Sequence, residues 1–110
     1  MLAVPTISLV GALPPYHGDA QKRFVSDKDE WDIRRYAVIS GRAEACGLDW
    51  QPHFKALMAH ERANGRTEDQ MTYIGVLHGM QSASIKDQPC SASKREKARK
   101  AVQGSINQLR

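Results

Sequence analysis

Apolar and polar residues alternate along most of this 110-residue chain with the three- and four-residue spacing of amphipathic helices. Residues 26–110 hold four such segments, separated by glycines or by short polar stretches. The pattern predicts an all-α fold, a small bundle of about four helices. Because the connections are short except for residues 82–90, successive helices are expected to run antiparallel.

The first helix is predicted to begin at Ser26, whose side chain can cap it with Asp29 three residues on. Gly47 suits the position just after its C-terminal end, where a left-handed conformation is common. The spacing predicts a buried stripe formed by Tyr36, Ile39, Ala43 and Cys46. Val38 beside the stripe and Trp31 one turn earlier complete the apolar face.

The second helix is predicted to start at Asp49 as N-cap and to end at Gly65. Pro52 is tolerated in its first turn, because the amide hydrogen that proline lacks would have no helical partner there. Its two faces are predicted to be an apolar one formed by Trp50, Phe54, Leu57 and Met58, and a solvent-facing one formed by Lys55, Glu61 and Arg62.

The third helix opens with a predicted capping box between Thr67 and Gln70. The fourth is predicted to begin at Ser91, or at Ser93 with Glu96 as its reciprocal partner. The buried residues of the third helix are predicted to be Met71, Ile74, Leu77 and His78, with Met80 as a further candidate. Those of the fourth helix are predicted to be Ala98, Ala101, Val102, Ile106 and Leu109.

Two glycines in the third helix, Gly75 and Gly79, form a G-x-x-x-G pattern. The polar residues around them exclude a membrane helix, so close packing of a bulky side chain such as Trp50 or Tyr36 is expected over them.

The N-terminal segment differs from the rest, and residues 1–25 are predicted to be an apolar arm and linker preceding a helical domain of residues 26–110. Residues 1–13 are apolar and uncharged, too short to span a bilayer as a helix, and interrupted by Pro5 and Gly11. Three interpretations stay open: the remnant of a signal peptide with its basic start upstream, a strand, or a partly extended arm that packs on the domain. No transmembrane span is predicted.

Composition indicates a folded chain, since 41% of residues are apolar and 25% are charged. The net charge of +4 is concentrated near the C-terminus. Residues 94–110 hold one acid, Glu96, and six basic residues: Lys94, Arg95, Lys97, Arg99, Lys100 and Arg110. This block can contact phosphates or an acidic partner. The alternative is a solvated helix face.

Two cysteines flank predicted helix ends, Cys46 at the end of the first helix and Cys90 before the fourth. A disulfide between them would close a loop of three helices and would persist only in an oxidising compartment. The sequence therefore predicts a periplasmic or secreted protein. The alternative is a pair of free, buried thiols in a cytoplasmic protein. Zinc is disfavoured because there is no C-x-x-C motif.

The histidines form no recognised catalytic or metal motif. His53 and His60 are seven residues apart, which is not the spacing of a metal-binding pair on one helix, and His78 lies on a predicted core face. No catalytic residue, metal ligand or cofactor is assigned, and the chain is not expected to be an enzyme.

The string YAVISGRAEACGLDW at residues 36–50, with YIGVLHGM at 73–80 and Cys90, looks like small exported bacterial proteins of unassigned function. The resemblance covers about half of the chain. The two-cysteine, all-helical plan is also similar to the small acid-stress chaperones of the bacterial periplasm, although no functional residue of that family is matched.

These observations favour an exported, non-enzymatic accessory protein that binds a protein partner. Two alternatives remain: a nucleic-acid-binding domain that uses the basic C-terminal helix, and a small metal-binding or enzymatic domain that uses His53, His60 and His78.

Overall fold

The computed structural model describes residues 24–110, and this part of the chain contains four helices and no strand. The helices are α2 (Asp27–Ala45), α3 (Gln51–Ala63), α4 (Glu68–Ala83) and α5 (Ala92–Leu109). Residues up to Glu30 form one compact unit, and residues 31–110 form a second. The predicted all-α bundle is confirmed. The predicted arm falls almost entirely on residues 1–23, outside the described part.

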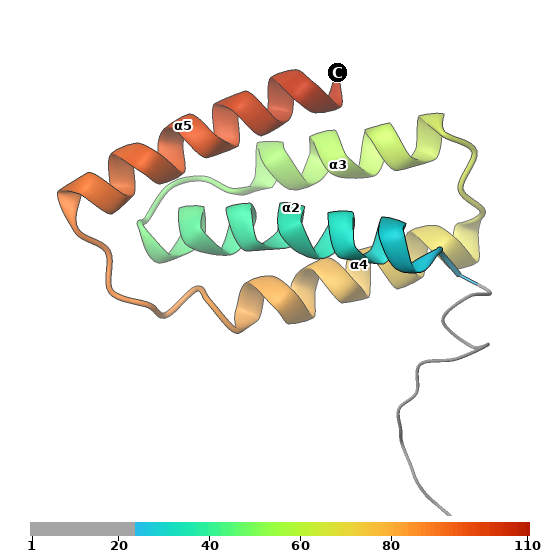
Figure 1. Cartoon of the computed structure of the whole chain (residues 1–110), viewed down its shortest axis with the longest axis horizontal. Helices are drawn as coiled ribbons and strands as arrows, with labels where there is room; N and C mark the ends of the chain where they lie inside the picture. Colours follow the sequence, from blue (N-terminus) through green and yellow to red (C-terminus); the bar gives the residue numbers. More distant parts are fainter. Residues whose placement is uncertain (1–23) are drawn as a thin grey trace, which may run out of the picture. The chain divides into compact units, whose positions relative to one another are not determined.

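Within residues 31–110, successive helices run in opposite directions, as predicted (Figure 1). Helix α3 packs against both α4 and α5. The turns that join α2 to α3 and α3 to α4 are short, whereas residues 84–91 form a longer connection that leads to α5. None of the helices in the described range is both long and apolar enough to cross a bilayer.

The helices begin at or next to the predicted N-caps. The N-cap of α3 differs from the prediction by one residue, and one of the two candidates predicted for α5 is its N-cap. The Ser26 Oγ accepts a hydrogen bond of 3.1 Å from the Asp29 amide, and Thr67 and Gln70 form the complete capping box. Ser91 caps α5, so Ser93 lies inside the helix and forms no box. The N-cap of α3 is Trp50 rather than the predicted Asp49, although Asp49 still accepts a hydrogen bond from the Gln51 amide.

Helices α2 and α3 end just before the two predicted glycines, Gly47 and Gly65. Gly47 and Gly65 have φ angles of +71° and +88°, a region that glycine enters without steric cost. The Leu48 amide donates to the Ala43 carbonyl and the Gly47 amide to the Glu44 carbonyl, which is the Schellman pattern. This turn at Gly47 makes Cys46 the C-terminal cap of α2.

The buried face of α2 is rotated from the predicted stripe. Its buried residues are Ile33, Ala37, Ser40, Gly41 and Ala43. Tyr36, Ile39 and Val38 are only half-buried, and Trp31 is 69% exposed. Ala43 is buried as predicted. The rest of the stripe was wrong, because the helix places Ile33, the polar Ser40 and the small Ala37 and Gly41 against its neighbours in place of the larger apolar side chains.

In α3, too, polar residues are buried while several large apolar residues predicted to be buried are not. Its buried residues are His53, Leu57 and Glu61, while Trp50, Phe54 and Met58 are half-buried. Glu61 was wrongly predicted to face water. Its carboxylate lies 2.7 Å from the Nε of Arg66, which neutralises it, and buried carboxylates need such a partner.

For α4 and α5, most of the residues predicted to be buried are buried in the structure. Met71, Ile74, Leu77 and His78 of α4 are buried, but Met80 is 69% exposed. In α5, Ala98, Ile106 and Leu109 are buried, while Ala101 is exposed and Val102 half-buried.

The glycine that permits close helix packing is Gly41, not the predicted pair. A Cβ added at Gly41 would lie 3.0 Å from the Ser82 carbonyl oxygen and 3.1 Å from the Ile85 Cβ. At Gly75 it would make only an ordinary contact of 3.9 Å with Met58, and at Gly79 it would meet nothing within 4 Å. The predicted packing of Trp50 or Tyr36 over Gly75 and Gly79 is therefore wrong.

We expect Gly41→Ala to destabilise the protein by about 1–3 kcal/mol, because the α4 backbone at Ser82 would have to shift. Gly79→Ala is the matched control. It removes a glycine from an open helix position and should stabilise by about 0.5–1 kcal/mol. Urea unfolding of the two variants tests this, and equal effects on stability would contradict the close approach.

Candidate functional site

The cysteines are joined, which confirms the predicted disulfide. The Cys46 and Cys90 sulfur atoms lie 2.03 Å apart and the Cα atoms 5.2 Å apart. The bond connects the C-terminal cap of α2 to the residue preceding the Ser91 cap of α5. A guanidinium nitrogen of Arg95 also donates to the Cys46 carbonyl. The end of α2 and the start of α5 are thus held together by a covalent bond and a hydrogen bond.

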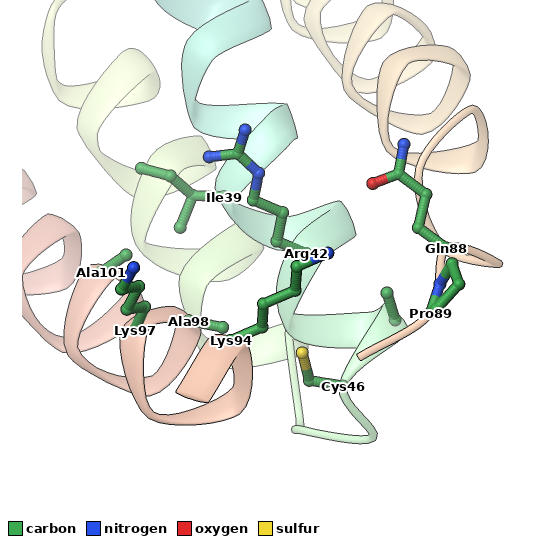
Figure 2. Close-up of a pocket in the computed structure, with 10 residues that line it drawn as sticks. Ile39, Arg42, Cys46, Gln88, Pro89, Lys94, Lys97, Ala98 and Ala101 are labelled. Atoms are coloured by element: carbon green, nitrogen blue, oxygen red, sulfur yellow. The ribbon is translucent and has the colours of Figure 1, made fainter. Parts of the chain in front are cut away.

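A pocket of about 430 Å³ opens beside this bond. Figure 2 shows its walls, which come from the end of α2, the α4–α5 connection and the first turns of α5. Its apolar surface comes from Ile39, Ala45, Pro89, Ala98 and Ala101, and its polar and charged groups are Arg42, Gln88, Lys94 and Lys97 beside Cys46.

A second cavity of about 400 Å³ adjoins the first. The two share four lining residues, Ala45, Cys46, Gln88 and Pro89. The second is completed by Cys90 and by residues of the α5 N-terminus, Ser91, Ala92 and Arg95. The surface beside the disulfide is therefore hollowed over two neighbouring compartments.

The pocket is electropositive. Arg42, Lys94 and Lys97 line it, and none of its ten lining residues is acidic. Within residues 24–110, the side chains of these three residues make no ion pair and no hydrogen bond. Their charges are available to a ligand.

The predicted basic block of α5 divides into two groups. Lys94, Arg95 and Lys97 line one cavity or the other. Arg99 and Lys100 lie outside both and pair with Glu96, whose carboxylate is 2.6 Å from an Arg99 nitrogen and 4.0 Å from the Lys100 Nζ. The hydrogen bond from Arg99 lowers the pKa of Glu96. Arg42, which shares the first pocket, was not predicted, because it lies 52 positions before Lys94 and only the fold brings them together.

A second candidate is a chain of hydrogen bonds in the core. Ser105 Oγ lies 2.7 Å from His53 Nε2, and His53 Nδ1 lies 2.7 Å from Ser40 Oγ. Ser40 Oγ is in turn 2.8 Å from His78 Nε2. These four residues come from α5, α3, α2 and α4 respectively, so a single polar chain connects every helix of residues 24–110.

Aromatic rings surround the imidazoles. The Phe54 and Trp50 ring centroids lie 4.6 Å and 6.0 Å from that of His78, and Tyr36 lies 6.1 Å from His53. Burial disfavours the charged imidazolium. It lowers the pKa of His78 to about 4, with a smaller contribution from His53, and it also lowers the pKa of His53.

The Ser40 hydroxyl lies between two imidazoles, which is the composition of a nucleophile and its base. Its accessibility does not suit catalysis, however, since Ser40 is 1% exposed, His53 0% and His78 2%. None of the three lines either cavity described above. This chain satisfies buried polar groups in the core.

His60 lies apart from the other two helix histidines. Its Nδ1 is 3.2 Å from the Leu109 carbonyl oxygen and its Nε2 is 3.2 Å from the Asn64 side chain. In the part of the chain that the structure describes, no three His, Cys, Asp or Glu side chains gather into a possible metal site. The convergence of His53, His60 and His78 that a metal site would require is absent from that part.

We expect stability to fall as the pH is lowered from 6.5 towards 4. The folded-state pKa of His78 lies below its unfolded value, so the unfolded chain binds the proton first and is favoured by acid. The loss between pH 7 and pH 5 should be about 2 kcal/mol for His78 alone. Urea unfolding at both pH values tests this, with His78→Phe expected to reduce the loss. A flat profile would contradict a neutral, buried His78.

The sequence has been compared with models of protein families, with curated proteins and with solved structures, and none of the three comparisons gave a match.

Proposed function

We propose that this chain is an exported, non-enzymatic accessory protein that acts by binding a protein partner. The observation that carries the proposal is the Cys46–Cys90 disulfide and the pocket that it borders. A disulfide of this kind persists outside the reducing cytosol, in the periplasm or in secreted proteins. A hollow with available charges next to a covalently fixed wall is a surface suited to recognition.

A binding role without catalysis is supported by the position of the reactive side chains. The Ser40–His53 and Ser40–His78 pairs lie in the core, whereas the pocket presents cations and small apolar groups. The lining of the pocket can attract an oppositely charged group and contact an apolar one, and both interactions strengthen the binding of a partner. A nucleophile held by an oriented base would be needed for covalent catalysis.

The experiment is to trap thiols in intact cells that make the protein naturally. The cells are quenched with acid, free thiols are alkylated, and the intact mass of the chain is measured with and without reductant in the periplasmic, secreted and cytoplasmic fractions. We expect the chain outside the cytoplasm, with no alkyl group added until it is reduced. Alkylated chain retained in the cytoplasm would refute export.

A further inference from the structure

The pocket beside the disulfide combines two chemistries, and the geometry points to one kind of occupant. We propose that it binds an acidic peptide segment of the partner protein, with one apolar side chain in the pocket and flanking carboxylates on Arg42, Lys94 and Lys97. This inference rests on the proposed function, because it names the chemistry of the partner.

Charge complementarity argues for an acidic segment. Three cations from two helices border one pocket whose lining includes no acid, and their like charges repel one another until an anion neutralises them. Arg42 can hold a carboxylate through two parallel hydrogen bonds, while Lys94 and Lys97 act as point charges. The disulfide holds the backbone at this wall, so binding has to order the three exposed side chains but not the helix ends that carry them.

The apolar surface argues for an anchoring side chain. Ile39, Ala98 and Ala101 line the same pocket. The isoleucine offers apolar surface, and the small side chains of the two alanines leave space for a larger group. The volume of about 430 Å³ lies within the roughly 300–1,000 Å³ typical of binding pockets. The adjoining cavity, which adds Arg95, allows an extended segment to continue beyond the anchor.

Nucleic acid fits the same surface less well. Single strands bind to proteins through aromatic platforms and a continuous basic track, whereas neither cavity is lined by an aromatic residue. The track along α5 is interrupted, because Arg99 and Lys100 are paired with Glu96.

The test begins with selection from a library of random 12-residue peptides against the oxidised full chain. We expect enrichment of sequences in which Asp or Glu flank one large apolar residue. The best peptide is then titrated by fluorescence anisotropy against the wild type, Lys94→Gln/Lys97→Gln and Ala101→Phe. Each variant should weaken binding about tenfold, which corresponds to about 1.4 kcal/mol, the first by loss of charge and the second by filling the pocket.

The matched control is Arg99→Gln/Lys100→Gln, which removes the same charge from the same helix outside both cavities. It should change affinity less than twofold, and thermal melting verifies that every variant is folded. The inference is overturned if no peptide is enriched, if the control weakens binding as much as Lys94→Gln/Lys97→Gln, or if a single-stranded oligonucleotide displaces the peptide. Each of these results leaves export intact, because thiol trapping decides export separately.

Discussion

Replacing both cysteines in Cys46→Ser/Cys90→Ser is expected to lower the free energy of unfolding by about 4 kcal/mol. The cross-link joins residues 44 apart in sequence, and in the loop-closure description its removal returns that much conformational entropy to the unfolded chain. A small domain has only about 5–15 kcal/mol in total. The variant should therefore remain folded at 25 °C with a much lower Tm.

Urea unfolding of the oxidised wild type, the reduced wild type and the double serine variant measures this effect. The last two should agree, because both lack the cross-link, and the denaturant slope should rise as the unfolded chain becomes less compact. A loss below about 1 kcal/mol would indicate that the unfolded chain retains contacts between the two cysteine regions.

The other large effect is expected at His53. His53→Ala removes the imidazole that both Ser40 and Ser105 contact, leaving two buried hydroxyls without that partner and a cavity where the ring lies. Together these changes should cost about 3–5 kcal/mol. His53 is fully buried at the centre of the chain of hydrogen bonds, so little rearrangement can relieve the loss.

Two further variants separate the causes. Ser105→Ala removes only the last link and should cost about 1 kcal/mol, while His60→Ala alters a half-buried histidine outside the chain and should cost less than that. If His53→Ala and His60→Ala are equally destabilising in urea unfolding, the buried chain does not stabilise the core as described.

Local signals made the helix ends predictable. A cap such as Thr67 with Gln70, or a left-handed glycine such as Gly47, involves groups within a few residues of each other, so the sequence carries the information directly. The one boundary error, Trp50 in place of Asp49, is a shift of a single residue.

The buried faces were harder to predict because the fold, not hydrophobicity alone, decides them. Ser40, His53 and Glu61 are polar yet buried, since partners on other helices or in the following turn satisfy them. Trp31 is apolar yet exposed. No single-helix pattern contains those partners, and for the same reason the sequence indicated Lys94 and Lys97 but missed Arg42.

The polar chain from Ser105 to His78 also sets the register of the bundle. Apolar contacts have no preferred direction, whereas hydrogen bonds of 2.7–2.8 Å require particular donor and acceptor positions. A helix that shifts along its axis breaks its hydrogen bond in this chain, and the buried hydroxyl or imidazole that it contacted on the neighbouring helix then lacks that partner. The four helices should therefore lose their amide protection against hydrogen exchange together, as a single cooperative unit.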